Sequence, residues 1–465
     1  MLSLALIDLS LCEVKMEVLE WKEKNKSARN YAHFDRKVSL DNVWNYISNP
    51  KNVKKHGFYP FIHYSKNFNK YHKDKEKGEI RKKTRELCYS AHIDRYIYSY
   101  YGFLINQNYN RYVLEKQIDT VAVAYRDNLG KNNIHFAKRA FDFIKDSRQS
   151  YVIIGDFTHF FDMLQHNYLK ERLCDVLGVD RLEEDYYSVF KNITKYSLWE
   201  LTDLLELNLL NDTEDDIKSL NAQKRVLSKE DFKKHKRKYI KVNCKDYGIP
   251  QGSAISAVLS NVYMINCDNR INTIVKDKSG LYMRYSDDFI IVLPNLQEDD
   301  FKKIFNEINN EILSVPNLIL QQDKTQIYKY ADENLISCNS LVFDEIEDGK
   351  NFINYLGFTF DGREITIRDK TITKYYYRLY RKLNTIVKNE GYTPKGKRIS
   401  CKNLYEKYSI KGSNLKNKDG EVKGNFITYV QRAEKVFGKS EPIDRKTKRH
   451  MLKIRRKLNE AFGKE

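Results

Sequence analysis

Cysteine is scarce in this chain and irregularly placed. The 465 residues include seven cysteines, an odd number, and no two of them form a CxxC pair. This pattern excludes a disulfide framework and a CxxC-type zinc site, and it favours the reduced thiols of a cytosolic protein. The sequence also has no visible internal repeat. Small disulfide-bonded, zinc-bound and repeat architectures are therefore excluded.

No targeting or membrane segment is evident in the sequence. The opening run Met1–Ile7 lacks a basic flank and meets Asp8 at once, so it predicts neither a signal peptide nor a membrane span. The stretch before Met16 reads unlike the rest of the chain, which leaves the true start open between Met1 and Met16. We expect a cytoplasmic protein without a membrane partner.

Acidic residues are fewer than basic residues in this chain. Lys and Arg number 82 against 63 Asp and Glu, which gives a formal net charge of +19. Residues 368–465 hold 28 Lys and Arg but only 10 Asp and Glu, so nearly the whole excess lies in the last fifth of the chain. A nucleic-acid backbone is the natural partner of such a segment. The alternative is a solvated, lysine-rich surface.

The length and the apolar pattern predict an α+β fold. A chain of 465 residues with 41% hydrophobic residues is too long for one simple core and too apolar to be disordered, so two or three subdomains are expected. Helices and strands alternate in the order of a small antiparallel sheet backed by helices. The predicted helices are 93–104, 133–144, 255–265 and 301–313, the predicted strands are 151–156, 281–285, 289–293, 318–320 and 355–360, the stretch 166–244 is mostly helical with an acidic loop at 211–216, and the tail is helical with breaks near 391–394 and 411–424.

Two adjacent aspartates, Asp287 and Asp288, lie between two apolar runs that both predict buried strands. Ser286 and Asp287 then form the tight turn of a hairpin. A third aspartate, Asp156, ends the predicted strand at 151–156. Carboxylates at the ends of apolar strands are costly unless a cation or an open cleft compensates them.

Strand-end carboxylates from separate chain segments are the ligands that a pair of Mg²⁺ ions needs for phosphoryl transfer. We expect Asp156 and Asp287 to be metal ligands. Asp288 is either a weaker third ligand or a turn carboxylate that hydrogen-bonds its own hairpin. The residues alone thus predict a metal-dependent phosphoryl-transfer enzyme with two Mg²⁺ per site.

The aspartates belong to a series of short motifs that resemble those of the reverse transcriptases. The motifs occur in the order of that family and on the expected elements. They are Gly155–Asp162, Gly248–Ser253, the YxDD box Tyr285–Asp288, Lys324–Thr325 and Tyr355–Phe358, preceded by Tyr125–Arg126 and Gly130–Lys131. The resemblance covers roughly residues 80–365. It implies a right-hand polymerase with fingers, a ferredoxin-like palm and a basic helical thumb.

The resemblance also implies domain boundaries. An N-terminal extension would occupy residues 1–80 and the fingers 81–150. The palm would occupy 151–366, with a helical insertion at about 167–245, and the thumb 367–465.

Further roles follow from the resemblance, each with a plainer alternative. Phe161 would lie against the sugar 2′ position and select deoxynucleotides, or it is a core phenylalanine. Gln251 and Gly252 would line the nascent base pair, where glycine lets the backbone approach closely, or they form an ordinary helix-entry loop. Asp162 is expected to cap the helix that follows it.

Basic residues are the expected contacts to phosphate. Arg126, Lys131 and Lys324 would bind the triphosphate, because Arg suits bidentate phosphate contacts and Lys supplies a mobile charge. Each alone could equally be a solvated basic residue. In the tail, 375–382 interleaves tyrosines with basic residues and would grip nucleic acid, unless its tyrosines pack on the palm. The expected nucleic-acid contacts are Tyr285, Arg378, Arg381 and Lys382.

Differences from the usual reverse transcriptase motifs narrow the group of these enzymes that the chain resembles. Ala254 and Ala257 stand where many relatives have proline, and no ribonuclease H, zinc endonuclease or integrase-like segment and no Val-Thr-Gly thumb signature is evident. The remainder is similar to bacterial defence-associated, abortive-infection reverse transcriptases, including the stretches His92–Tyr98 and Phe58–Ile62. This resemblance implies an RNA-directed DNA polymerase with an RNA template, such as a dedicated non-coding RNA, a DNA product, and either a second subunit or a homo-oligomer.

Three other activities stay open on the sequence. The first is DNA synthesis without a template or from a protein primer. The second is an RNA-binding scaffold with a polymerase fold, against which the three aspartates argue. The third is an RNA polymerase on the same palm, which only Phe161 disfavours.

Overall fold

The computed structural model describes residues 17–27, 29–73, 78–390, 392, 396, 401–416, 420 and 422–462. The two candidate start residues lie outside these ranges, as do parts of the predicted breaks near 391–394 and 411–424. Within the described residues, no helix combines the length and the apolar character that crossing a membrane requires. The chain divides into two compact units.

The first unit comprises residues up to 126, 157–271 and 309–319. Its elements are α2 (Leu40–Ile47), α3 (Pro50–Lys54), β1 (Phe61–Lys73), β2 (Gly78–Tyr89), α4 (His92–Glu115), α6 (Phe160–Met163), α7 (His166–Leu177), α8 (Glu184–Thr194), β4 (Ser197–Glu200), α9 (Leu201–Leu207), α10 (Glu214–Ala222), α11 (Lys229–Tyr239), β5 (Lys241–Val242) and most of α12 (Ala254–Asp277).

A four-stranded sheet of order β2-β1-β4-β5 organises the first unit. Strands β1 and β2 form a long antiparallel hairpin, and β1 runs parallel to β4, with Ile62 opposite Trp199. Trp199 is fully buried in an apolar cluster with Phe34 and Leu204. The expected domain boundary at residue 80 is wrong as a structural division, because it falls inside the hairpin.

Two buried carboxylates hold the start of α4. Asp35 accepts hydrogen bonds of 3.0 Å from the backbone N–H groups of His92 and Ile93. Asp94 lies 2.7 Å from the Nε2 atom of His56 and accepts a second hydrogen bond from the backbone of Tyr59. Burial raises the pKa of Asp94, and its hydrogen bonds act against that shift. These contacts give the predicted motif at 92–98 a structural role.

The second unit comprises residues 127–156, 272–308 and 320 onward. Its elements are η1 (Asp127–Leu129), α5 (Asn133–Asp146), β3 (Gln149–Asp156), β6 (Leu281–Tyr285), β7 (Asp288–Pro294), most of α13 (Glu298–Leu313), η2 (Gln322–Lys324), β8 (Gln326–Ala331), β9 (Asn334–Ser337), η3 (Asn339–Leu341), β10 (Ile353–Tyr355), β11 (Phe358–Phe360), β12 (Ile365–Ile367), α14 (Asp369–Lys388), α15 (Cys401–Tyr408), η4 (Ile410–Gly412), α16 (Phe426–Phe437) and α17 (His450–Phe462).

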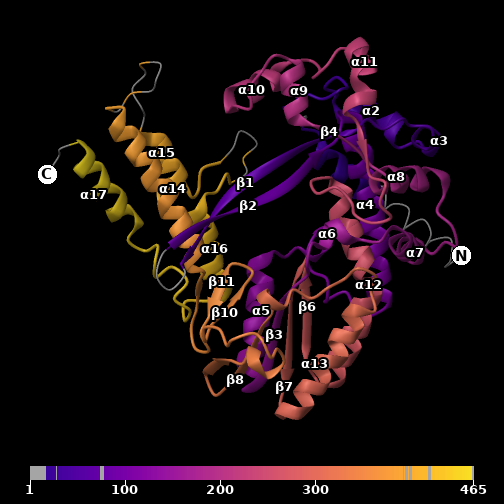
Figure 1. The fold of residues 1–465 in the computed structure, drawn as a ribbon. Coiled ribbons are helices and arrows are strands. Elements are labelled where there is room, and N and C mark those ends of the chain that lie inside the picture. The colour runs from indigo at the N-terminus through magenta and orange to yellow at the C-terminus, as the bar shows by residue number, and fades with distance from the viewer. Residues whose placement is uncertain are drawn as a thin grey trace, which may run out of the picture. The chain divides into compact units, whose positions relative to one another are not determined.

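An antiparallel sheet of order β6-β7-β3-β8-β9 forms the centre of this unit (Figure 1). Successive residues of β3 point to opposite faces, so each face has its own cover. Val152 packs in one cluster with Phe141 of α5. Tyr151 points the other way and stacks on Phe301 of α13, with the ring centroids 4.2 Å apart. Both faces of β3 are therefore buried, as its continuous apolar run predicts.

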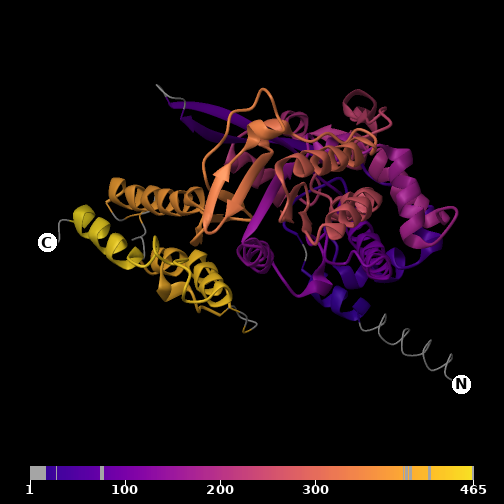
Figure 2. The ribbon, with the colours of Figure 1, turned by 90° about the horizontal axis from the view of Figure 1, so that it is seen from below.

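The described residues of the basic tail include the helices α14 to α17, drawn in orange to yellow in Figures 1 and 2. Buried residues of α14, α15, α16 and α17 join the same apolar cluster as α5 and the second, three-stranded sheet β10-β11-β12. Glu441 adds a polar tie, because its carboxylate binds Lys145 of α5 at 2.5 Å and the backbone N–H of Ile365 at 2.7 Å. The tail is thus packed on the sheet-bearing part of its unit.

The predicted α+β class, with an antiparallel sheet backed by helices and a basic helical tail, is confirmed. Several predicted elements need correction. Residues 318–320 form no strand. The predicted strand 355–360 is two strands, because Leu356 and Gly357 turn the chain with φ of +47° and +95°. The acidic stretch 211–216 is only partly a loop, since α10 begins at Glu214. Helices α4 and α12 are longer than predicted.

Gly155 provides a test of the packing beside the candidate site. A Cβ atom at this position would lie 2.3 Å from Cζ of Phe289, whose ring is fully buried, and 3.1 Å from Leu320. We expect Gly155→Ala to lower the free energy of unfolding by about 1–3 kcal/mol, because the ring must move in a packed core. Urea unfolding measures this effect. Gly57→Ala is the matched control, since a Cβ there meets nothing within 4 Å. Equal effects of the two substitutions would contradict the prediction.

Candidate active site

The pairing of β3 with β7 brings two of the predicted carboxylates together. The register of these antiparallel strands places Asp156 directly opposite Asp288, at the end of the ladder. The adjacent hairpin has the predicted form, since Tyr285 pairs with Asp288 and leaves only Ser286 and Asp287 in the turn. All three aspartates therefore lie at one edge of the same sheet.

The turn that carries Asp287 has an unusual backbone. Ser286 adopts a left-handed φ of +64°, in a turn position that normally favours glycine. Arg284, which is completely buried, donates a hydrogen bond of 2.9 Å from Nη1 to the carbonyl oxygen of Ser286. Sequence reasoning missed Arg284, although an arginine inside an apolar strand is a signal of a buried polar contact.

Lys324 lies beside Asp156, as part of the carboxylate cluster. Its Nζ atom is 2.5 Å from Oδ2 of Asp156 and 2.5 Å from Oε1 of Gln321. The other carboxylate oxygen of Asp156, Oδ1, is buried and has no hydrogen-bond partner among the described residues. The predicted triphosphate contact is thus also a counter-charge to a predicted metal ligand.

The three aspartates interact electrostatically. Exclusion of water by the surrounding protein, followed by the charges of Asp287 and Asp156, raises the pKa of Asp288 to about 6. The side chain still reaches solvent at the surface. Lys324 and Arg368 act in the opposite direction and lower this pKa. Sequence reasoning missed Arg368, which has no motif of its own and becomes relevant only through the fold.

The residues at this edge fit a divalent cation with incomplete protein coordination. Among the described residues, no group of three or more His, Cys, Asp or Glu side chains is placed so that it could hold a metal ion. Mg²⁺ is commonly held by one or two carboxylates, with water and substrate phosphates as the remaining ligands. The buried, unpartnered Oδ1 of Asp156 and the mutual repulsion of the aspartates are the features that a cation would relieve. Two magnesium ions per site remain a prediction.

The second motif lies in the first unit, in the loop that leads into α12. Phe161, on the short helix α6, is partly exposed, whereas its neighbour Phe160 is buried. Gln251 donates a hydrogen bond of 3.3 Å to Asp162. Asp162 therefore lies within α6 and binds this loop, and the prediction that it caps the following helix is wrong, because Gln165 caps α7.

Gly252 permits a close approach of two backbones. Its φ is +112°, and a Cβ atom there would lie 2.4 Å from the carbonyl oxygen of Cys88, at the end of β2. The backbone N–H of Cys88 also donates to the carbonyl of Gln251 at 2.8 Å. Gly252 was expected to let the backbone approach a base pair. In the structure its backbone lies against the β1–β2 hairpin, so the fold itself requires a glycine at this position.

The two basic residues of the predicted fingers motif have different surroundings. Arg126 is buried, and its guanidinium group donates hydrogen bonds to the side chain of Asn110 and to the carbonyl oxygens of Asp119 and Ala122. This placement favours a structural role over the predicted triphosphate contact. Lys131 is exposed and precedes α5. Its predicted role stays a prediction.

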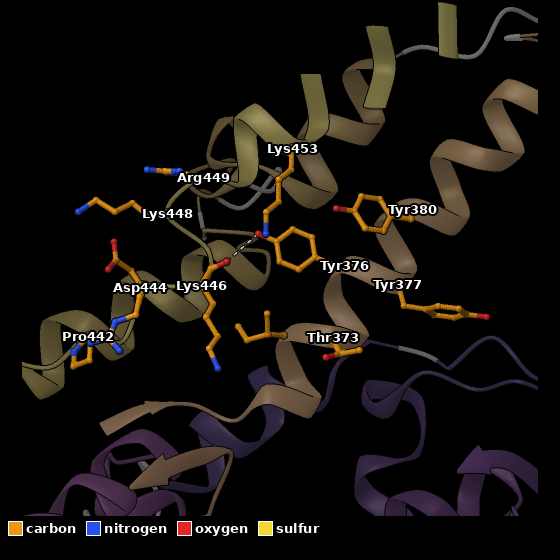
Figure 3. Close-up of a pocket in the computed structure, with 12 residues that line it drawn as sticks. Thr373, Tyr376, Tyr377, Tyr380, Pro442, Asp444, Lys446, Lys448, Arg449 and Lys453 are labelled. Carbon is orange, nitrogen blue, oxygen red and sulfur yellow. Dashed lines mark hydrogen bonds between the residues drawn. The ribbon is translucent and has the colours of Figure 1, made fainter. Parts of the chain in front are cut away.

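The tail contains a groove of about 1060 Å³ between α14 and the segment that leads into α17 (Figure 3). Tyr376, Tyr377 and Tyr380 line one side, and Lys448, Arg449 and Lys453 line the other. Tyr377 is 64% exposed. Tyr376 is buried, lies under Lys453 and donates a hydrogen bond to the carbonyl oxygen of Lys446.

Both predicted roles of 375–382 are therefore present on one helix. Tyr375 and Tyr376 pack inward, as the alternative expected. The predicted nucleic-acid contacts Arg378, Arg381 and Lys382 are exposed on α14 and form no ion pair within the described part of the chain. The buried tyrosines thus anchor α14 to the protein, and its basic side chains are exposed on the outer face.

Comparison with known proteins finds a family model that matches the part of the chain with most of the motifs. Residues 213–360 match the family model described as reverse transcriptase (RNA-dependent DNA polymerase). No curated protein is significantly similar to this chain. Similar solved structures include an apo telomerase from Candida tropicalis truncated from its C-terminal domain, with 13% identity over 73% of this chain and 63% of that one and a TM-score of 0.39. A telomerase from Candida albicans in complex with a TWJ fragment of telomeric RNA has 12% identity over 91% of this chain and 66% of that one, also with a TM-score of 0.39.

This chain spans less than two thirds of each of these telomerase chains. The family match includes the second motif and the YxDD box, while Asp156 lies before it and is tied to the site by strand register. Residues 213–360 are therefore similar to the reverse transcriptase (RNA-dependent DNA polymerase) family, and this segment carries Asp287 and Asp288.

Proposed function

We propose that this protein is an RNA-directed DNA polymerase that extends a 3′-hydroxyl group with deoxynucleoside triphosphates. The observation that supports it most is the pairing of Asp156 with Asp288, which lies within the family-matched segment, with Lys324 in contact with Asp156. Such an edge offers hard oxygen ligands and a cation within one small site. This combination suits transfer of a nucleotidyl group.

In the proposed reaction, the primer 3′-oxygen forms a bond to the α-phosphorus while the bond to pyrophosphate breaks. Asp156 and Asp287, with Asp288 as a weaker partner, would hold two magnesium ions, which supply activation of the hydroxyl group and stabilisation of the leaving pyrophosphate. Lys324 would neutralise charge on the triphosphate once it releases Asp156. Arg284 would keep the aspartate turn in position through Ser286.

The substrates and the biological role complete the proposal. Phe161 would exclude the 2′-hydroxyl group of ribonucleotides, and its partial exposure is compatible with contact to a substrate. The basic tail would hold an RNA template, such as a dedicated non-coding RNA, together with the DNA product. We place the enzyme in the cytoplasm of a bacterium, in defence against phage, on the basis of the motif resemblance described above.

The carboxylate site is tested by Asp287→Asn. The substitution keeps the size of the side chain but removes its charge, so we expect incorporation of dNTPs with Mg²⁺ to fall by about a hundredfold or more. Primer extension on an RNA template measures the effect. Asp288→Asn should have a smaller effect.

Asp332→Asn is the matched control for this experiment. Asp332 lies in the two-residue turn between β8 and β9, and the register places that turn at the opposite edge of the same sheet. Wild-type activity is expected for this variant. Full activity of Asp287→Asn would remove the two-metal assignment.

The sugar selection is tested by Phe161→Ala. Removing the ring opens the space beside the 2′ position, so discrimination between dNTPs and rNTPs should fall by about tenfold or more. Competition between the two nucleotides in primer extension measures it. Phe161→Tyr keeps the bulk and should keep the discrimination. An unchanged preference in Phe161→Ala would show that Phe161 serves only packing.

The defence role has its own test in a bacterial host that expresses the protein. We expect fewer phage plaques with the wild-type chain and no reduction with Asp287→Asn at equal protein levels, because protection would require synthesis. Protection by both chains would contradict a catalytic defence role. It would favour the RNA-binding scaffold instead.

Template-independent or protein-primed synthesis uses the same carboxylates and differs only in the primer and template. DNA that stays attached to the protein in denaturant would identify a protein primer. Incorporation without any added RNA, after nuclease treatment of the enzyme, would identify the untemplated reaction.

A further inference from the structure

The first unit contains a cavity of about 640 Å³, a volume within the usual range of small-molecule sites. Its walls come from the N-terminal segment, the β1–β2 hairpin, α4, α9, α10 and the start of α12 with the loop before it. Among the described residues that line it, none is Asp or Glu. The lining residues with the most distinctive chemistry are Arg29, Tyr31, Tyr64, Tyr89, Arg95 and Ser253.

Arg95 gives the cavity hydrogen-bond donors that lack partners among the described residues. Its Nε and Nη2 atoms are buried and have no hydrogen-bond partner among the described residues. The guanidinium group lies over the ring of Tyr96, 4.1 Å from the ring centroid, which fixes its plane. The Oγ atom of Ser253 is likewise buried and without a partner. Buried charged donors are costly to leave unpaired, and the planar guanidinium fork matches the oxygens of a phosphate group.

The tyrosines form a rigid, neutral wall. Tyr31 stacks on His92 with the ring centroids 4.6 Å apart, and its hydroxyl group donates a hydrogen bond of 2.9 Å to the carbonyl of Ser90. Tyr89 meets Tyr31 edge-on at 5.1 Å and Tyr64 at 6.0 Å. Burial raises the pKa of Tyr31 to about 12, so its phenol is neutral near neutral pH. Fixed aromatic surfaces of this kind accept the flat face of a nucleobase.

We propose that this cavity is a nucleotide-binding site in which Arg95 and Arg29 hold a phosphate group and the tyrosines hold the base. The ligand is a phosphorylated nucleoside, either free or as one unit of a single strand. Gly252 of the second motif also lines the cavity. Neither arginine belongs to the proposed polymerase chemistry, so the proposal does not rest on it.

The test is direct binding to the full-length protein without divalent cations, measured by calorimetry. The probe is 2′-deoxyadenosine 5′-monophosphate, with adenosine as the probe that lacks phosphate. We expect Arg95→Met to weaken binding of the nucleotide by about tenfold or more and to leave adenosine unchanged, because it removes only the phosphate contacts. Arg29→Met should weaken the nucleotide in the same direction, and this residue is exposed, so its loss leaves the core intact.

Arg111→Met is the matched control, because Arg111 lies on the same helix α4 but is exposed outside the cavity. A single-stranded oligothymidylate of eight nucleotides, in about 0.3 M salt to suppress binding to the basic tail, distinguishes the two ligand sources. Arg95-dependent binding of the mononucleotide indicates a free nucleotide, and Arg95-dependent binding of the oligonucleotide alone indicates a strand. Absence of both, or wild-type affinity in Arg95→Met and Arg29→Met, would overturn the proposal. Polymerase loss in Asp287→Asn is a separate readout, so the two proposals can fail independently.

Discussion

The pairing of β3 with β7 is the constraint on which the candidate site depends, because it decides which side chains share the end of the sheet. Seven consecutive residue pairs run from Ser150 opposite Pro294 to Asp156 opposite Asp288. A slip by one residue would exchange the two faces of the strand and separate the carboxylates. This register requires a glycine at position 155, since the ring of Phe289, its partner on β7, lies where a Cβ atom would be. The glycine before Asp156 is thus a packing requirement of the strand pair that positions this aspartate.

Holding three carboxylates at one edge has an electrostatic cost that the fold only partly offsets. The raised pKa of Asp288 reports that cost, and the cations of Lys324 and Arg368 reduce it. Lys324 contacts one oxygen of Asp156 and leaves the other buried without a partner in the described residues. A divalent cation would add charge compensation that these side chains do not complete. The magnesium ions proposed above would relieve this imbalance.

The sequence pattern predicted the central antiparallel sheet well, because its strands are short apolar runs that end at polar residues. The apolar runs around Asp287 and Asp288 permit little but a hairpin, and the strand ending at Asp156 is equally plain. Contacts between residues distant in the sequence decided the structure and role of the residues that were predicted wrongly or missed. Residues 318–320 look like a strand, yet two backbone hydrogen bonds, from Thr158 to Ile319 and from Gln321 to Asp156, form an isolated bridge there and not a strand. Arg126 looks like a phosphate ligand, yet its donors are used by neighbouring carbonyls that no sequence motif reveals. Arg95 carries no polymerase motif, and only the cavity shows that its donors lack a partner.

The charge of the tail illustrates why a count of basic residues overstates a binding surface. Arg445 is bound by both carboxylate oxygens of Glu364, and Lys446 pairs with Asp369, so these two cations tie the segment between α16 and α17 to the residues just before β12 and at the start of α14. Such exposed pairs contribute little stability, but they remove charge from the surface offered to a polyanion. Lys448 and Arg449 line the groove and have no acidic partner within ion-pair distance in the described part of the chain. Affinity for a nucleic-acid backbone should therefore depend on these unpaired cations more than on the net charge of the tail, and its dependence on salt should reflect their smaller number.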